Sequence, residues 1–391
     1  MKAKEIKKGI YWVGGIDWDL RNFHGYLTQR GSTYNSYLII DEKITLIDNV
    51  KHYLYDEMLT RIKSIIEPDK IDYIVQNHVE MDHSGTLPKL KQIAKNAVIV
   101  TSPNGKKGLE KHYDTSDWEF RVVSTGDNLN IGKRNLEFLL TPMVHWPDNM
   151  LTFCLEEKIL FSNDSFGQHI ASSERFDDEY PYNIIMEEAK KYYANIVLPY
   201  GNMVQKELKA AAKLDIEIIA PSHGLIWRKH IPQIVEKYKK WSENKADEKA
   251  LIIYDTMWKS TEKIAVAVQD AFENMNIKTR KLNLRVNHIS DIMTEVLNSK
   301  YICVGSPTLN NNMLPTVASF LTYLKGLAPK NRFGLAFGSY GWGGQSIGLV
   351  ENELKSCKFD LLNKIKVNYI PRKQELKKIT QDLETQINDI N

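Results

Sequence analysis

The hexapeptide HVEMDH at residues 78–83 constrains the fold of this chain more than any other feature of its sequence. Four of its side chains commonly bind metal ions: His78, Glu80, Asp82 and His83. The run YIVQN at residues 73–77 directly precedes it, so the hexapeptide begins where a predicted strand ends. In an extended turn alternate side chains point to the same side, and His83 follows at the predicted start of a helix. The pattern therefore predicts a metal site at the end of a strand.

Three further residues of ligand type each follow an apolar run that is predicted to form a strand. His145 follows residues 136–144, Asp164 follows residues 159–163, and His223 follows residues 216–222. The carboxyl ends of neighbouring strands often meet at one edge of a sheet, where binding sites are built. We therefore expect these three residues to join the hexapeptide.

The combined set contains four imidazoles, three carboxylates and no thiolate: His78, Glu80, Asp82, His83, His145, Asp164 and His223. Seven ligands are too many for one tetrahedral zinc ion, but they suit two ions that share a carboxylate bridge. Imidazole and carboxylate ligands are compatible with iron, manganese or zinc, so ligand chemistry leaves the metal open. His112, His230 and His288 lack this pattern, and we interpret them as surface or structural residues.

The apolar runs indicate two domains, which is the usual organisation for 391 residues. In the first part, runs typical of strands lie at residues 37–40, 71–75, 97–100, 136–140, 158–161 and 216–219, and helical patterns lie at 87–94 and 184–194. Strands and helices do not alternate strictly here. We therefore expect a layered sandwich of sheets with outer helices, in a domain at residues 1–247.

Around residues 242–249 the sequence turns polar and loses its apolar period, as a linker does. Beyond this point, strand patterns at 250–254, 301–304 and 333–337 alternate regularly with helical stretches. Regular alternation is typical of an open, doubly wound parallel sheet. We expect such a sheet in a second domain at residues 250–391.

The composition excludes several classes of protein. The net charge of +3 is small and the charges are interleaved, which argues against nucleic-acid binding. No stretch approaches the roughly 18 apolar residues of a membrane helix, and the charged N-terminus does not resemble a signal peptide. Cys154, Cys303 and Cys357 are too far apart to form a CxxC pair. We therefore expect a protein of the reducing cytoplasm with no membrane partner.

Residues 254–261, with the sequence YDTMWKST, lie between a predicted strand and a predicted helix. Taken alone, such a turn is usually a helix cap, but hydroxyls beside the N–H groups of a helix start also suit a phosphomonoester such as that of FMN. Loops at 305–312 and 338–344 follow strands of the same predicted sheet edge. Their glycines permit close approach to a ligand, and aromatic side chains suit a planar ring. The residues expected at FMN are Thr256, Met257, Trp258, Ser260, Thr261, Ser306, Pro307, Thr308, Asn310, Asn311, Ser339, Tyr340, Gly341, Trp342 and Gly343.

The motif HxExDH, followed by separate His, Asp and His residues, resembles that of the metallo-β-lactamase superfamily. Glu80 stands where hydrolytic zinc members carry histidine, and in this the chain resembles the redox branch, the flavodiiron proteins. The segment at 254–261 and the two glycine-containing loops resemble the flavin-binding loops of flavodoxins. The resemblance spans essentially the whole chain. It implies an α/β fold, with an N-terminal metallo-β-lactamase αββα sandwich followed by a flavodoxin-like doubly wound parallel sheet.

The resemblance also implies how the ligands are divided between two iron ions. One iron would be bound by His78, Glu80, His145 and Asp164, and the other by Asp82, His83, His223 and the shared Asp164. FMN would pass electrons to the irons, which reduce dioxygen to water, nitric oxide to nitrous oxide, or both. The sequence leaves the gas open, with a slight preference for dioxygen. His24 and Tyr200 lie in segments that the family shares, and they serve either the gas pocket or packing alone.

The expected partners follow from the same resemblance. In the family the flavin of one subunit lies against the irons of the other, so a head-to-tail homodimer or a dimer of dimers is expected. The chain contains no CxxC rubredoxin module, so its electrons are expected to come from a separate rubredoxin-type protein.

Two other functions stay open at this point. A zinc-dependent hydrolase of the metallo-β-lactamase type, with an accessory flavin-binding domain, would use similar ligands. Glu80, the near-neutral charge and the flavin loops disfavour it. An electron carrier in which only the flavin works would not need seven intact ligands.

Overall fold

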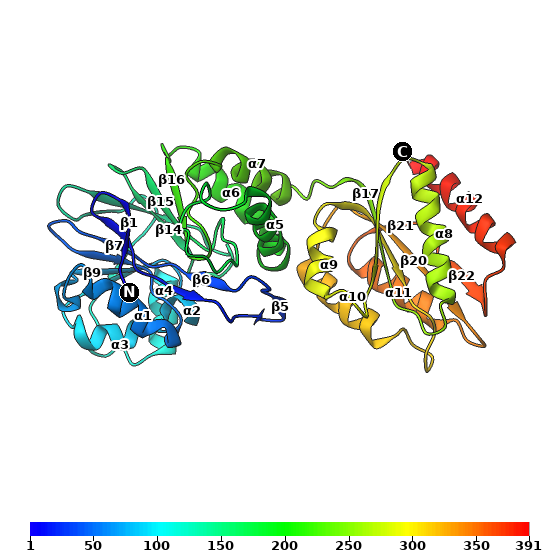
Figure 1. Ribbon diagram of the computed structural model, residues 1–391, viewed down its shortest axis with the longest axis horizontal. Coiled ribbons are helices and arrows are strands. Elements are labelled where there is room, and N and C mark those ends of the chain that lie inside the picture. Colours follow the sequence, from blue (N-terminus) through cyan, green and yellow to red (C-terminus); the bar gives the residue numbers. More distant parts are fainter. Residues whose placement is uncertain (391) are drawn as a thin grey trace. The chain divides into compact units, whose positions relative to one another are not determined.

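The computed structural model describes residues 1–390, and its chain forms two compact units (Figure 1). The first unit comprises Met1–Tyr192 and Asn202–Lys239. The second comprises Tyr193–Gly201 and the chain from Lys240 onwards. The second unit is therefore assembled from two separate stretches of sequence.

The first unit contains two large sheets. The seven-stranded sheet has the order β1-β2-β7-β8-β9-β10-β11, and the five-stranded sheet has the order β12-β13-β14-β15-β16. The strands of the first sheet are β1 (Lys4–Lys7), β2 (Ile10–Trp12), β7 (Tyr37–Ile39), β8 (Thr45–Ile47), β9 (Tyr73–Gln76), β10 (Val98–Thr101) and β11 (Phe120–Val122). Those of the second are β12 (Asn128–Asn130), β13 (Asn135–Leu140), β14 (Met150–Cys154), β15 (Ile159–Asn163) and β16 (Ile218–Pro221). Short ladders pair β3 (Gly15–Asp17) with β6 (Ser32–Tyr34) and β4 (Asn22–Phe23) with β5 (Tyr26–Leu27).

The α-helices that accompany these sheets are α1 (Tyr55–Lys63), α2 (Met81–Ser84), α3 (Leu87–Ile93), α4 (Pro103–His112), α5 (Tyr182–Tyr192), α6 (Gly201–Ala211) and α7 (Ile231–Ser242). Apolar side chains fill the space between the sheets, where Val75 of β9 and Phe161 of β15 belong to one buried cluster. The adjacent Ile74 points to the opposite face of β9 and joins the cluster that contains α1, α3 and α4 residues. Leu160 of β15 likewise packs on the α6 side, against Ala210. Both sheets are thus buried on both faces, and the predicted αββα sandwich is confirmed.

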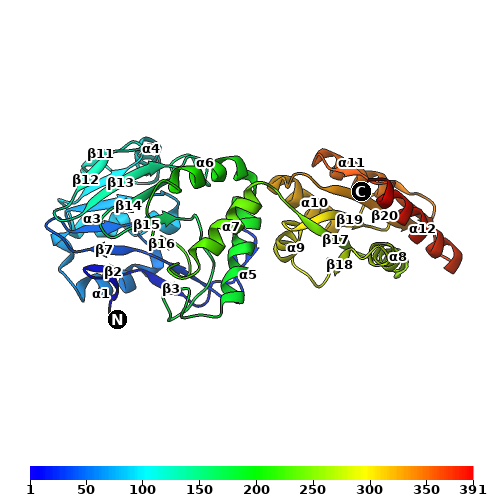
Figure 2. The same ribbon diagram turned by 90° about the horizontal axis from the view of Figure 1, so that it is seen from above.

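The second unit is built around one parallel sheet with the order β18-β17-β19-β20-β21, and β22 also pairs with β20. Its strands are β17 (Asp247–Tyr254), β18 (Lys278–Asn283), β19 (Ser299–Gly305), β20 (Phe333–Tyr340), β21 (Asp360–Leu361) and β22 (Ile365–Asn368). Its helices are α8 (Ser260–Asn274), α9 (Ile289–Val296), α10 (Pro315–Leu327), α11 (Gln345–Ser356) and α12 (Lys373–Ile390). Figure 1 shows the strands between α9 and α10 on one face and α8 and α12 on the other, and in Figure 2 α8 is viewed nearly end-on. The second strand in sequence lies outside the first, which is the order of a flavodoxin-like sheet, and this confirms the prediction.

The structure differs from the sequence pattern at the start of this sheet. β17 begins at Asp247, inside the polar stretch that predicts a linker. Its first side chains are exposed and form ion pairs such as Lys300–Glu248 at 3.0 Å, so this part of the strand lacks an apolar pattern. The pattern also fails to predict β18, whose sequence KTRKLN is mostly polar, as an edge strand permits. None of the described helices is both long enough and apolar enough to span a lipid bilayer.

A candidate dinuclear metal centre and a flavin pocket

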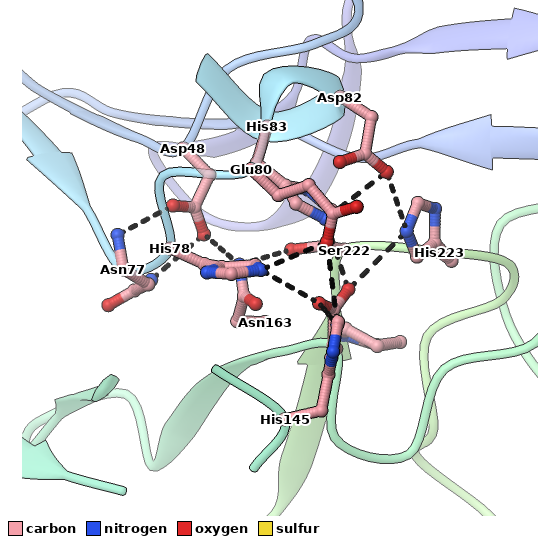
Figure 3. Close-up of polar contacts among 12 residues, drawn as sticks. Asp48, Asn77, His78, Glu80, Asp82, His83, His145, Asn163, Ser222 and His223 are labelled. Atoms are coloured by element: carbon pink, nitrogen blue, oxygen red, sulfur yellow. Dashed lines mark hydrogen bonds and ion pairs between the residues drawn. The ribbon is translucent and has the colours of Figure 1, made fainter. Parts of the chain in front are cut away.

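All seven predicted metal ligands lie together in the first unit (Figure 3). One group consists of His78, Glu80, His145 and Asp164, and a second consists of Asp82, His83 and His223. Within each group the candidate ligand atoms lie within 4.8 Å of one another. The two groups have the composition that the sequence predicts for two metal ions.

Strand ends position most of these side chains. His78 follows β9, Asp164 directly follows β15, and His223 follows β16. Asp82 and His83 lie in the short helix α2, which begins directly after Glu80. His145 differs from the prediction, because β13 ends at Leu140 and the histidine lies in the loop that leads to β14.

Asp164 lies between the two groups. Its Oδ2 is 3.1 Å from Nε2 of His145 and 3.6 Å from Nε2 of His78. Its Oδ1 is 3.1 Å from Nε2 of His83 and 3.4 Å from Nε2 of His223. Each carboxylate oxygen therefore faces one group, which is the arrangement of a bridging ligand.

The neighbouring histidines keep the two central carboxylates of the cluster ionised. Burial alone would raise the pKa of Asp164, but the neighbouring histidines, His83 foremost, hold it well below its usual range. Burial would also raise the pKa of Glu80, and hydrogen bonds from His24 and His78 lower it instead. Both carboxylates are therefore held in the ionised form that binds a metal ion.

Several buried polar atoms of the cluster have no hydrogen-bond partner in the protein. They are both carboxylate oxygens of Asp82, both ring nitrogens of His83 and Oδ1 of Asp164. His83 Nε2 approaches Asp82 Oδ2 at 3.4 Å, but the contact lacks hydrogen-bond geometry. Leaving such atoms unsatisfied costs roughly 1–3 kcal/mol each. Carboxylate and imidazole atoms that converge without bonding one another fit bound metal ions, iron among them.

Protein contacts also orient the ligand imidazoles. Nδ1 of His78 donates to Oδ2 of Asp148 at 2.8 Å, and Nδ1 of His223 donates to the carbonyl of Thr33 at 2.9 Å. In both rings Nε2 is left for a metal ion, and such contacts fix the tautomer of metal-binding histidines. The sequence pattern does not identify Asp148 or Thr33, because neither belongs to the spacing of the motif.

A buried polar network joins the strand ends behind the ligands (Figure 3). Asp48 accepts hydrogen bonds from the backbone and side-chain amides of Asn77 at 2.7 and 2.9 Å. Asn163, the last residue of β15, donates to Asp48 at 3.4 Å and to Ser222 at 3.1 Å. The network therefore links the ends of β8, β9, β15 and β16, from which His78, Asp164 and His223 project.

The cluster is closed on one side and accessible on the other. Asp82, His83, Asp164 and His223 are almost fully buried, whereas Glu80 is partly exposed. A cavity of about 330 Å³ opens beside Glu80, and its lining includes Phe23, His24, Lys51, Glu80, Met81 and Asp82. A cavity next to the ligands is where a small substrate would reach the metal ions.

The two predicted catalytic residues have different positions. His24 Nε2 lies 3.0 Å from Oε1 of Glu80, and this hydrogen bond raises the pKa of His24. Tyr200 lies in a 3₁₀ turn, Leu198–Tyr200, that belongs to the second unit. The structure shows no interaction between Tyr200 and the seven ligands among the residues it describes.

Two residues beside the cluster are not identified by the sequence pattern. The ring of Tyr192, at the end of α5, lies 6.0 Å from that of His223, and burial and the charge of Asp164 hold the pKa of its phenol well above its usual range. His169 is fully buried, with its ring 4.9 Å from that of His223. Burial and the neighbouring His223 hold the pKa of His169 well below its usual range.

A pocket of about 400 Å³ lies at the carboxyl ends of the strands in the second unit. Nine of the predicted FMN residues line it: Thr256, Met257, Trp258, Ser260, Pro307, Ser339, Tyr340, Gly341 and Trp342. Trp258 is 89% exposed and Trp342 is 93% exposed, so both indoles stand at the pocket mouth with no protein packed on them. Exposed aromatic side chains at a pocket suit a planar ligand ring.

The phosphate end of this pocket fits the predicted ligand as well. Helix α8 begins at Ser260, so its first backbone N–H groups are available beside the loop. The hydroxyl of Thr256 is buried and has no protein partner. Asp255 braces the loop, since its Oδ1 accepts from Arg285 at 2.6 Å and its Oδ2 accepts from Thr316 at 2.6 Å. An unsatisfied hydroxyl at a helix N-terminus fits the phosphate group of FMN.

The other predicted FMN residues do not line the pocket: Thr261, Ser306, Thr308, Asn310, Asn311 and Gly343. Thr308 instead bonds Ser346 at 2.8 Å. Gly305 serves strand packing rather than ligand approach, since a Cβ there would lie 2.2 Å from the ring of Phe337. Tyr369 and Ile370 line the pocket without being predicted, because they follow β22 in a segment without a motif.

Comparisons with known proteins give a match for each of the two units. Residues 33–224 match the family model described as "ODP family beta lactamase", and residues 252–381 match that described as flavodoxin. The chain is 44% identical to a nitric oxide reductase of Moorella thermoacetica, over 95% of each protein. It is 42% identical to a rubredoxin-oxygen oxidoreductase of Megalodesulfovibrio gigas, over 95% of this chain and 94% of that protein.

A solved structure gives the same result for the fold. The flavodiiron protein of Giardia intestinalis superposes with a TM-score of 0.96 at 34% identity, covering 99% of this chain and 96% of that one. At identities above 40%, these alignments cover 95% of this chain and therefore include residues of both units. The chain belongs to the family of flavodiiron proteins.

Proposed function

We propose that this protein is an oxidoreductase that reduces dioxygen to water, nitric oxide to nitrous oxide, or both, at a diiron site supplied with electrons through FMN. One observation carries the proposal: Asp164 offers one carboxylate oxygen to each of two adjacent ligand groups, in a chain that also has a flavin pocket. Relatives named for reduction of nitric oxide and of oxygen support both substrates.

The residues divide the work between two ions. His78, Glu80, His145 and Asp164 would hold one iron, and Asp82, His83, His223 and Asp164 the other. Bound FMN would exchange electrons singly or in pairs, and the bound irons would bind and polarise the gas. Asp148 and Thr33 would keep the Nε2 atoms of His78 and His223 directed to the metals.

Reduction of either gas consumes protons, and residues at the cavity would supply them. His24 Nε2 would hold a proton against Glu80, since their 3.0 Å contact raises the pKa of His24. The hydroxyl of Tyr192 would not be such a source, because burial raises its pKa and it keeps its proton beside His223. The role predicted for Tyr200 has no contact that supports it and stays a prediction.

The flavin would be held by the pocket of the second unit. Thr256, Ser260 and the start of α8 would bind the phosphate, and Trp258, Tyr340 and Trp342 would flank the ring. A separate rubredoxin-type protein would deliver electrons to the flavin held in this pocket. The name of the relative from Megalodesulfovibrio gigas supports this donor.

We also propose a head-to-tail dimer, or a dimer of dimers, in which the flavin of one subunit lies against the irons of the other. Trp258, Trp342 and Ile370 form an exposed apolar rim around the flavin pocket. Tyr53 and Met81 are exposed near the metal cavity. Such apolar groups are usually covered by a partner surface, and one symmetric contact would cover both sets.

One set of measurements tests the proposed activity. Purified protein, reconstituted with iron and FMN and reduced under anaerobic conditions, is mixed with dioxygen or nitric oxide while an electrode follows each gas. We expect reduced rubredoxin to sustain consumption of at least one of them. Zinc instead of iron and no yellow flavin colour in the protein before reconstitution, together with no consumption of either gas afterwards, would instead favour the hydrolase alternative.

A further inference from the structure

His169 lies next to the proposed second iron but belongs to neither ligand group. It is fully buried, and its Nε2 has no hydrogen-bond partner. Its Nδ1 lies 2.8 Å from Oγ of Ser32. An unpartnered ring nitrogen in a buried site costs roughly 1–3 kcal/mol, so a second partner from outside the protein is expected.

The surroundings of His169 repeat those of a ligand histidine. His223 donates from Nδ1 to the Thr33 carbonyl and turns Nε2 towards Asp82 and Asp164, whereas Nδ1 of His169 is bonded by the adjacent residue, Ser32. Strand β6 therefore orients both rings. The ring of His169 also contacts Phe23, with centroids 5.4 Å apart, and Phe23 lines the cavity beside Glu80 and Asp82. His169 thus lies directly behind one wall of that cavity and beside the ring of His223.

The contacts of Ser32 determine which nitrogen of His169 carries the hydrogen. Ser32 has one hydroxyl hydrogen and two possible acceptors, Nδ1 of His169 at 2.8 Å and the Thr33 carbonyl at 3.1 Å. The Thr33 carbonyl already accepts from His223, and the contact with His169 is the shorter one. Ser32 therefore donates to Nδ1, and a neutral imidazole that accepts at Nδ1 carries its hydrogen on Nε2.

We propose that His169, held by Ser32, donates a hydrogen bond from Nε2–H to the small molecule bound at the iron of Asp82, His83 and His223. The proposal rests on the function proposed above and names a further residue that contacts the bound molecule. A donor of this kind stabilises negative charge that develops on an oxygen or nitrogen atom during reduction. It would act without binding the metal itself.

Two substitutions separate the two ring nitrogens. The shorter side chain that H169N introduces would place its amide near the former Nδ1 and keep the contact with Ser32, whereas the longer one of H169Q reaches towards the former Nε2. The probe is azide, an anion that accepts hydrogen bonds. Its dissociation constant is measured from the absorption change of the oxidised, iron-loaded protein. Iron content and thermal midpoint are measured alongside, and H112N, at an exposed histidine, is the control.

We expect H169N to weaken azide binding on the order of tenfold with unchanged iron content, and H169Q to restore most of the affinity. If H169N binds azide with wild-type affinity, His169 has only a packing role. If H169N loses iron, His169 is itself a metal ligand. Either result overturns the proposal.

The variant S32A tests the same idea if H169N does not fold. It keeps the imidazole but releases Nδ1, so the Nε2–H tautomer is no longer enforced, and azide should again bind more weakly. Unchanged azide affinity in S32A would refute the proposal. Wild-type protein assayed for gas consumption in the same preparation separates the two failures, because loss of the proposed function would appear there first.

Discussion

His78 donates a 2.8 Å hydrogen bond from Nδ1 to Oδ2 of Asp148, and both side chains are buried. The same oxygen accepts the backbone N–H of Val79 at 2.8 Å, so it holds the ring and the start of the ligand loop together. Loss of a carboxylate behind a ligand histidine commonly lowers metal affinity by about 10–100-fold. We predict this loss for D148A, measured by competition with a chelator. D148N keeps one acceptor and should lie between D148A and the wild type.

Replacement of Asp164 should affect both metal positions. Its two oxygens face separate ligand groups, so D164A removes a ligand from each and leaves the opposing histidines without a counter-charge. We predict that iron content falls to near zero and that neither gas is consumed, while FMN content is unchanged. Metal analysis and flavin absorbance on one sample check this. Retention of one full equivalent of iron would show that Asp164 does not bridge.

The hydroxyl of Thr256 provides a test of the flavin pocket. Its Oγ1 is buried without a protein partner, so Thr256→Val removes a hydrogen bond to the cofactor and little else. We predict that the affinity for FMN falls roughly tenfold, measured by quenching of flavin fluorescence. Thr385→Val, at an exposed position on α12, is the matched control. Equal affinities in the two variants would remove Thr256 from the site.

Glu207 should make the stability of the first unit depend on pH. Burial raises the pKa of Glu207 from 4.5 to about 7, and its Oε1 has no hydrogen-bond partner. The unfolded chain ionises at the lower value, so stability is full below about pH 4.5 and is lost as pH rises through about 7. The difference corresponds to roughly 3 kcal/mol.

We therefore predict that E207Q removes this loss. The free energy of unfolding of the variant, relative to wild type, should increase between pH 5 and pH 8, as measured by denaturant titration. E236Q, at an exposed position on α7, should show no such change. A parallel pH profile for E207Q and wild type would contradict the prediction.

The proposed dimer predicts complementation between two inactive variants. D164A would keep its flavin and lose its irons, whereas a variant lacking flavin, such as one with Thr256→Val and S260A combined, would keep its irons. If electrons cross between subunits, an equal mixture that is allowed to exchange subunits should regain about a quarter of the wild-type activity, because half of the dimers are then mixed and each mixed dimer has one complete flavin–iron pair out of two. Transfer within one chain would leave the mixture inactive. Light scattering of the wild type gives the number of subunits.

The sequence predicts which candidate ligands lie together because His78, Asp164 and His223 follow strand ends, and the carboxyl ends of neighbouring strands meet at one edge of a sheet. It does not predict the residues that orient the ligands. Asp148 is an ordinary aspartate in a loop, and Ser32 and Thr33 lie in a three-residue strand far from the motif. Such contacts depend on tertiary structure, which no local pattern records.

The same limit explains the differences in the second unit. The edge strand β18 has a mostly polar sequence, so hydrophobic periodicity cannot identify it. Tyr369 reaches the flavin pocket because β22 pairs with β20, and strand order is not visible in the sequence around it. The glycine pattern predicts ligand approach at Gly305, but the ring of Phe337 occupies the space beside it.

The division of the second unit into two stretches of sequence limits how the protein can be cut. Residues 193–201 belong to this unit, and Asn195 within them donates to the carbonyl of Ser290 and accepts from the hydroxyl of Tyr323. A fragment that begins near residue 250 would lack these nine residues and leave both partners exposed. A single nick by a protease near residue 245 would likewise fail to free the flavin-binding part, because its other stretch is still continuous with α5 and α6.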